Sequence, residues 1–206
     1  MLLCDIGNTF LHFLDDKRGE YKREVVAFNP STLLEKVYYI SVNKTLSKKL
    51  EDLDNWIDVE PFIQRENYYE TMGIDRICAV EAISHGVIID AGSALTVDIV
   101  RDGVYEGGFI SPGKRAMQKC YSEISPALRY PFHFELDQQK LATNSQDAIS
   151  YGYLKLLASE ILSYNLPIVL TGGDAEDFAK LFKSVAVNKR LLFEGMQKII
   201  TSIEKI

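Results

Sequence analysis

Sulfur ligands and long apolar runs are scarce in this chain of 206 residues. Its three cysteines, Cys4, Cys78 and Cys120, stand far apart and form no C-x-x-C pair. An odd, scattered set excludes a disulfide framework and a cysteine-based zinc site, and it favours reduced, buried thiols. No stretch approaches the ~20 apolar residues that a membrane span requires, and residues 1–4 are too short for the core of a secretory signal. The sequence therefore predicts a cytoplasmic protein with no membrane partner.

The chain also has fewer positive than negative charges. Lysine and arginine number 23 against 29 aspartates and glutamates, which gives a net charge of −6. A nucleic-acid partner would require a basic face, so none is expected, whereas a nucleotide requires only a few donors and a metal ion. The three histidines lack the H-E-x-x-H spacing of a zinc site, and we expect them to be structural. What the chain does have is 47% hydrophobic and 25% charged residues, a composition typical of a folded protein with one large domain or two small ones.

One pattern of strand, tight turn, strand, turn and strand occurs twice. In the first copy an apolar run ends at Asp5, and Gly7 and Asn8 form the turn; in the second, residues 87–89 lead to Asp90, Gly92 and Ser93. The strands that follow are expected at 10–14 and 21–28 in the first copy, and at 94–100 and 104–110 in the second. Two copies of one unit predict two similar α/β domains, 1–85 and 86–206, joined without a flexible linker and with a cleft between them.

Helical and strand patterns complete each copy. Helices are expected at 31–36, 45–53, 73–85, 145–162 and 176–182, and in a C-terminal segment that ends at 203. Further strands are expected at 37–42, 168–170 and 191–193.

The turns Asp5-x-Gly7 and Asp90-x-Gly92 suit phosphate binding. Glycine lets the backbone approach closely, and successive amides with a hydroxyl or carboxamide donate to anionic oxygens. The aspartate at the strand end is left to hold a hydrated magnesium ion. A plain hairpin turn explains either copy alone, but it explains two matching copies poorly.

Asp75 and Arg76 begin the helix expected at 73–85. They could be a carboxylate that compensates the helix dipole and a solvated neighbour. Alternatively, Asp75 is a base for an alcohol and Arg76 a fork for a substrate carboxylate. Gly172 and Gly173 follow an apolar strand, where a flat adenine or ribose could lie on the backbone, although many such turns are rich in glycine for packing alone.

Four motifs resemble those of type III pantothenate kinases in order and approximate spacing. They are Asp5-Ile6-Gly7-Asn8-Thr9, Gly73-Ile74-Asp75-Arg76, Asp90-Ala91-Gly92-Ser93-Ala94-Leu95-Thr96 and Gly107-Gly108-Phe109-Ile110-Ser111-Pro112-Gly113. The resemblance extends from residue 1 to at least Gly173, and the second and third motifs are the most specific. It implies two ribonuclease-H-like domains of the actin-like ATPase superfamily that flank a nucleotide cleft, and the transfer of phosphate from ATP to pantothenate, the first step of coenzyme A synthesis.

The resemblance also implies the roles of individual residues. Those expected at ATP are Asp5, Ile6, Gly7, Asn8, Thr9, Ser93, Gly172 and Gly173. Those expected at pantothenate are Tyr69, Gly73, Ile74, Asp75, Arg76 and Ser145, with Asp75 as the catalytic base. Asp5 would hold magnesium through water, Asp90 would bind a monovalent cation (potassium or ammonium), and the enzyme would be a homodimer. Serine stands at 93 and 145 where the family usually has threonine, which keeps the hydroxyl but loses a methyl group.

Two alternatives remain open at this point. One keeps the fold and changes the substrate, to another small-molecule kinase or a phosphohydrolase of the same superfamily. The other is a non-catalytic regulatory homologue, against which the joint presence of Asp5, Asp75, Arg76 and Asp90 argues.

Overall fold

The computed structural model describes residues 1–203, which form two compact units. The first unit contains Met1–Ala82 and the C-terminal segment that begins at Leu191, and the second is Ile83–Arg190. We expected 86–206 to form the second domain, but the C-terminal helix packs in the first unit instead. It does so because it packs closely against the helix that contains Cys78.

The first unit is built on a five-stranded mixed sheet of order β3-β2-β1-β4-β5. Its strands are β1 (Leu2–Ile6), β2 (Phe10–Asp15), β3 (Gly19–Glu24), β4 (Val37–Ser41) and β5 (Trp56–Asp58). Its helices are α1 (Lys44–Leu50), α2 (Ile74–Ala82) and α7 (Leu191–Ile203), with short 3-10 turns at Val25–Ala27, Pro30–Thr32, Glu60–Phe62 and Arg65–Asn67. The central strand β1 is parallel to β4 and antiparallel to β2.

The alternation of β1 assigns its side chains to two faces of the sheet. Leu2, Cys4 and Ile6 are buried in a cluster with Leu46 and Leu50 of α1. The α1 helix begins after Asn43, whose side chain accepts a hydrogen bond from the Leu46 amide at 3.0 Å. Leu3 and Asp5 therefore point to the opposite face of this sheet, and β1 and β4 contact α7 and α2 respectively.

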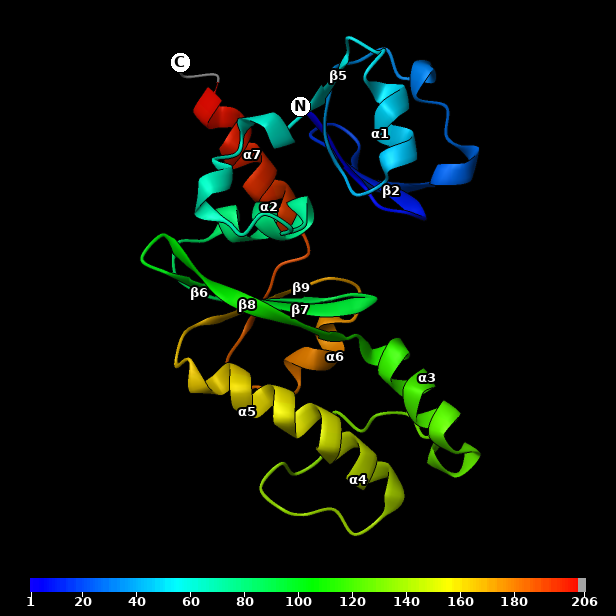
Figure 1. Cartoon of the computed structure of the whole chain (residues 1–206), viewed down its shortest axis with the longest axis vertical. Helices are drawn as coiled ribbons and strands as arrows, with labels where there is room; N and C mark the ends of the chain where they lie inside the picture. The colour runs from blue at the N-terminus through cyan, green and yellow to red at the C-terminus, as the bar shows by residue number, and fades with distance from the viewer. Residues whose placement is uncertain (204–206) are drawn as a thin grey trace. The chain divides into compact units, whose positions relative to one another are not determined.

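Helices α2 and α7 lie side by side in the first unit (Figure 1). Gly195 of α7 approaches the backbone carbonyl of Cys78 on α2 so closely that any side chain there would collide. Lys198 also donates to the carbonyl of Glu81 at 2.7 Å. This close packing explains why α7 belongs with α2.

The second unit repeats the sheet of the first. Its order is β10-β9-β6-β7-β8. Taken from β8 to β10, this order matches the first sheet strand for strand, with β6 in the place of β1. The strands are β6 (Gly86–Ala91), β7 (Ala94–Arg101), β8 (Val104–Pro112), β9 (Ile168–Thr171) and β10 (Ala186–Val187). The predicted internal duplication is thus confirmed in the topology.

Helices of the second unit cover its core cluster. They are α3 (Lys114–Ile124), a 3-10 turn Pro126–Leu128, α4 (Ser145–Ser150), a π-helical stretch Tyr151–Lys155, α5 (Leu156–Ser163) and α6 (Ala175–Ala179). Val87, Ile89 and Ala91 of β6 join this cluster with side chains of α5 and α6. Asp90 alternates with them and points to the other face of the sheet.

Some elements differ from the sequence-based expectation. A strand expected at 191–193 is the first turn of α7. The helix expected at 31–36 is only the 3-10 turn Pro30–Thr32, which Asn29 caps. The third strand, expected at 21–28, ends at Glu24. Strand β5, helix α3 and the two-residue β10 were not predicted. Strands β5 and β10 are too short, at three and two residues, for an alternating pattern to reveal them, and the largely polar α3 has no apolar run.

In the part of the chain from residue 1 to 203, no helix is long and apolar enough to cross a membrane.

Candidate functional site

The first predicted site is the turn that joins β1 and β2. The Gly7 amide donates to the Phe10 carbonyl at 3.0 Å, which closes a tight loop with Asn8 and Thr9 exposed at its tip. Asp5 is half-buried just before this loop, on the sheet face that α2 and α7 cover. Exposed amides and side chains next to a partly buried carboxylate are what a phosphate and its hydrated cation require.

Asp75 lies in the first turn of α2. The first intrahelical hydrogen bond runs from the Ile77 amide to the Gly73 carbonyl at 3.1 Å, and the Asp75 Oδ1 atom accepts from the Arg76 amide at 2.9 Å. A Cβ atom at Gly73 would lie 2.5 Å from that Oδ1 atom. The half-buried carboxylate thus lies over Gly73, and this placement requires a residue without a side chain there.

Cys78 lies one turn farther along α2, where the carboxylates of both motifs affect the pKa of its thiol. Burial raises the pKa of its thiol, and the negative charges of Asp5 and Asp75 raise it further. Burial and the charge of Asp5 also raise the pKa of Cys4. The motifs that contain Asp5 and Asp75 are distant in sequence, and the fold of the first unit brings them to one region around Cys78.

Arg76 is buried and meets Tyr69. Only 7% of Arg76 is exposed, and its guanidinium donates to the Tyr69 hydroxyl and lies 5.7 Å from the centre of the Tyr69 ring. Tyr69 is 44% exposed. The Tyr68 hydroxyl instead donates to Glu81 at 2.6 Å. Of the two neighbouring tyrosines, Tyr69 accompanies Arg76, at the start of α2 where Gly73 and the buried Ile74 also lie.

The second predicted turn joins β6 and β7. The Gly92 amide donates to the Ala94 carbonyl at 3.0 Å, and Ser93 is exposed at the tip. The half-buried Asp90 lies against Gly172, whose φ of +88° and whose contacts with the Asp90 carboxylate and the Ala91 carbonyl leave no room for a side chain. Asp174 completes the contact, because its amide donates to the Ala91 carbonyl at 2.9 Å. The loop with Gly172 and Gly173 therefore packs on the Asp90 turn.

The donors around Asp90 fit a hard cation. Asp90 supplies a half-buried carboxylate at the end of β6, and carboxylate oxygens are among the ligands that such cations prefer. Within residues 1–203, no group of three or more histidine, cysteine, aspartate or glutamate side chains is arranged to hold a metal ion. Asp5 and Asp90 each supply a single carboxylate, which suits an ion that keeps water or substrate oxygens.

Lys114 is a charged residue of this region that the motif analysis missed. It follows Gly113, whose amide donates to the Ser93 carbonyl at 3.1 Å. The Lys114 ammonium lies 2.7 Å from Asp174 Oδ1 and 2.6 Å from Asp177 Oδ2. Burial would lower the pKa of Lys114, but the hydrogen bonds to these two carboxylates outweigh it and raise the pKa. The sequence holds the lysine and both acids, but their separation along the chain hides the pairing.

Ser145 is the exposed first residue of α4 in the second unit. Asn144 caps this helix by accepting from the Asp147 amide at 2.9 Å, and Asp147 also lies 2.7 Å from the His133 ring. Contact with His133, and then with Asn144, lowers the pKa of Asp147. The residues predicted at pantothenate are thus divided: Tyr69, Asp75 and Arg76 gather in the first unit, whereas Ser145 belongs to the second.

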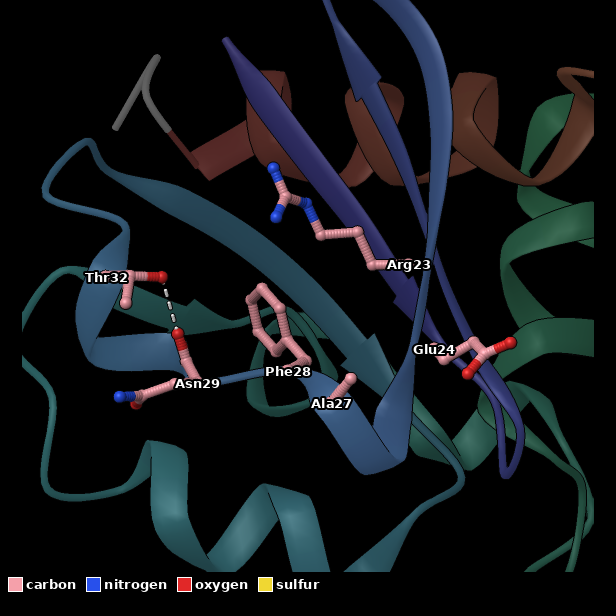
Figure 2. Close-up of a pocket in the computed structure, with 6 residues that line it drawn as sticks. All are labelled: Arg23, Glu24, Ala27, Phe28, Asn29 and Thr32. Carbon is pink, nitrogen blue, oxygen red and sulfur yellow. Dashed lines mark hydrogen bonds between the residues drawn. The ribbon is translucent and has the colours of Figure 1, made fainter.

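One hollow of the first unit lies outside the predicted motifs. This cavity has a volume of about 470 Å³. Figure 2 shows its lining residues, with the Phe28 ring between Arg23 and the turn of Asn29 and Thr32. The Thr32 hydroxyl donates to the Asn29 carbonyl at 2.7 Å. None of the six residues that line the cavity is among the predicted site residues, so it adds nothing to the site above.

Comparison with proteins of known structure identifies the fold. A Campylobacter jejuni protein that is named as a Baf family transcriptional activator has a TM-score of 0.87, is 36% identical, and matches over 100% of both chains. MreB5 of Spiroplasma citri, in a structure bound to ADP, has a TM-score of 0.52 at 10% identity, with 99% of this chain and 97% of that chain covered. The second likeness concerns the fold alone. Together with the repeated sheet order, it confirms the predicted fold class, two similar domains with the actin-like fold.

Sequence comparison identifies the family. The profile of the type III pantothenate kinases matches residues 15–164. The type III pantothenate kinase of Sulfurimonas denitrificans is 54% identical over 200 residues, with 97% of each chain covered. That of Campylobacter jejuni subsp. jejuni is 39% identical over 202 residues, with 97% of this chain and 96% of the relative covered. With its two aspartate turns and its Gly73-Ile74-Asp75-Arg76 motif on one such fold, the chain belongs to the type III pantothenate kinase family.

Proposed function

We propose that this chain transfers the γ-phosphoryl group of ATP to the terminal hydroxyl of pantothenate, giving ADP and 4′-phosphopantothenate. The observation that carries this proposal is the cluster at the start of α2, where Asp75, Arg76 and Tyr69 lie together. A carboxylate, a guanidinium and a phenol within one cluster match an acceptor that has a hydroxyl to activate and a carboxylate to hold.

In this proposal the start of α2 handles the acceptor. Asp75 orients the pantothenate hydroxyl and accepts its proton as the new bond forms. Only the Oδ1 atom of Asp75 takes part in the hydrogen bond to the Arg76 amide, so the Oδ2 atom can take this role. Arg76 presents its fork to the pantothenate carboxylate, and Tyr69 holds that guanidinium in place. Gly73 and Ile74, at the start of the same helix, complete the residues proposed for the acceptor. The assignment of Ser145 to pantothenate stays a prediction.

The two aspartate turns handle the nucleotide. The segment Asp5-Ile6-Gly7-Asn8-Thr9 binds the phosphates, and Asp5 holds magnesium through water; the divalent ion neutralises charge on the phosphates during transfer. Ser93 donates to ATP, and the turn with Gly172 and Gly173 receives the adenosine part. Asp90 binds the monovalent cation, potassium or ammonium, through its carboxylate oxygens.

The experiment is direct. Purified protein is incubated with ATP, magnesium, potassium and pantothenate, and the product is identified by mass. Formation of 4′-phosphopantothenate supports the proposal, whereas product from another alcohol and none from pantothenate would favour a different kinase of the same fold. Nucleotide binding without any product would favour a non-catalytic regulator.

We also propose a homodimer. Strand β8 lies at the edge of its sheet, and Val104 and Ile110 on it are 63% and 61% exposed. An edge strand with exposed apolar side chains is suited to cover by a second copy. Light scattering should give twice the chain mass, and Ile110→Lys should shift the protein toward the monomer. A monomer at micromolar wild-type concentration would contradict the proposal.

A cytoplasmic location is proposed from the thiols. Cys4, Cys78 and Cys120 are all free, which suits a reducing compartment.

A further inference from the structure

Three loops of the second unit meet at the junction between β8 and α3. The Gly113 amide donates to the Ser93 carbonyl of the Asp90 turn at 3.1 Å. Next along the chain, Lys114 reaches Asp174, which directly follows Gly172 and Gly173. The Asp174 amide in turn donates to the Ala91 carbonyl at 2.9 Å. Backbone and side-chain contacts thus form a closed ring through the Asp90 turn, the junction and the Gly172–Gly173 turn.

Lys114 is the charged member of that ring. Its side chain is 20% exposed and that of Asp174 is 18% exposed, so both charges are largely withdrawn from water. The second carboxylate, Asp177, lies on α6 and is 37% exposed. Removal of the ammonium would leave the largely buried Asp174 without its cation and beside Asp177, which would keep only its 3.8 Å contact with Lys180 among the ion pairs of residues 1–203. The Gly172–Gly173 turn, which ends at Asp174, would then lose its tie to the junction.

We propose that Lys114 is a positioning residue for nucleotide binding. By holding Asp174, it keeps the Gly172–Gly173 turn against the Asp90 turn, so that both are in place before the nucleotide arrives. This inference rests on the proposed function only in assigning these two turns to ATP. Because Lys114 acts through Asp174, its loss should weaken nucleotide affinity and leave the acceptor cluster of the first unit unchanged.

The junction has a second anchor, which makes the test practicable. The Tyr153 hydroxyl donates to the Pro112 carbonyl, and Tyr153 is buried. Burial raises the pKa of this phenol to about 12, so it remains a donor at neutral pH. Replacement of Lys114 therefore leaves the end of β8 attached to the core, and the variant is expected to fold.

The test compares Lys114→Met, Lys114→Arg and wild type. Methionine keeps much of the apolar stem and removes the charge, whereas arginine keeps the charge. Lys119→Met is the matched control, because Lys119 lies on the same helix, is 76% exposed and meets only Glu123 at 3.6 Å among the ion pairs of the described residues. For each protein, calorimetry measures the Kd of ADP with magnesium, steady-state kinetics give both KM values, and the Tm is recorded.

We expect Lys114→Met to weaken ADP binding and raise the ATP KM by roughly tenfold, the low end of the loss expected for hydrogen bonds to charged groups. The pantothenate KM should stay within about twofold, Lys114→Arg should recover most of the affinity, and Lys119→Met should match wild type. Unchanged ADP affinity in Lys114→Met, or an equal rise in both KM values, would overturn the inference. If wild type makes no 4′-phosphopantothenate, the proposed function fails, and the ADP measurement still decides the role of Lys114.

Discussion

The two aspartate turns occupy equivalent places in two sheets of the same strand order, yet their surroundings differ. Between the paired residues Ile6 and Leu11 the first turn holds residues 7–10, whereas between Ala91 and Leu95 the second holds residues 92–94 and is one residue shorter. Asp5 pairs across the sheet with His12, and Asp90 pairs with Thr96. One scaffold was thus used twice with different local chemistry.

The difference extends to what covers each turn. The helix α2 brings Asp75 and Cys78 near Asp5, whereas the second turn is covered by the backbone of Gly172 and by Asp174. The residues proposed for the acceptor therefore lie in the same unit as the turn proposed for the phosphates, whereas the turn proposed for the adenosine part lies in the second unit. Topology alone therefore does not assign function to a strand end; the side chains around it do.

The largest effect is expected from a substitution in the acceptor cluster, at Asp75. Asp75→Asn keeps an oxygen that can accept from the Arg76 amide, so the start of α2 should survive, but an amide cannot take the proton of the alcohol. Loss of a general base commonly costs 10²–10⁴ in rate. We expect kcat to fall by about that factor while ATP binding is retained.

Rate and Tm are measured on the same sample, with Glu81→Gln on the same helix as the control. Near-normal turnover with a lowered Tm would show that Asp75 serves only the helix N-terminus, where a carboxylate contributes about 0.3–1 kcal/mol.

A smaller effect is expected at Arg76. Arg76→Lys keeps the charge but loses the planar fork, so the pantothenate KM should rise roughly ten- to a hundredfold while the ATP KM changes little. Tyr69→Phe, which removes only the hydroxyl that accepts from Arg76, should give a weaker change in the same direction. Kinetics with each substrate varied separately measure this. Equal changes for both substrates would point to a structural role of the buried guanidinium.

The two aspartates should differ in their response to potassium. Asp90→Asn should lower activity by about tenfold at limiting potassium, the loss expected for about 1.4 kcal/mol of binding, and excess potassium should partly restore it. Asp5→Asn should not respond to potassium, because its proposed ion is magnesium. Rates are titrated against potassium at fixed magnesium. Full wild-type activity with sodium in place of potassium would contradict the assignment of Asp90.

The smallest effect is expected in the pH dependence of stability, at His12, which pairs with Asp5 across the sheet. Burial lowers the pKa of His12, the nearby Lys22 lowers it further, and Glu20 opposes this. The unfolded chain then binds the proton more readily, so stability is greatest above the unfolded pKa of about 6.5 and falls as the pH drops through the folded value. Thr96, the equivalent neighbour, does not titrate.

Urea unfolding between pH 8 and pH 5 tests this. The free energy of unfolding should fall less steeply with acid in His12→Gln than in wild type, and Thr96→Ser should keep the wild-type slope. Parallel curves for wild type and His12→Gln would refute the contribution of His12.

The sequence by itself determined the duplication and the motifs. Asp5 and Asp90 with their glycines recur in one order, and a repeated pattern of buried strands leads to a repeated sheet because each copy meets the same local constraints of alternation and turn. The start of α2 was also predicted, because Gly73 and Asp75 are typical of a helix N-terminus. These are properties of residues close together in the chain.

Only the tertiary structure decided which distant residues meet. The segment at 191–193 could be a strand or a helix from its apolar residues alone, and the fit of Gly195 against Cys78 made it part of α7 in the first unit. The contact of Lys114 with Asp174 likewise joins residues that are far apart in the sequence of the second unit. Such contacts depend on packing over long chain separations, for which local sequence carries no periodic signal.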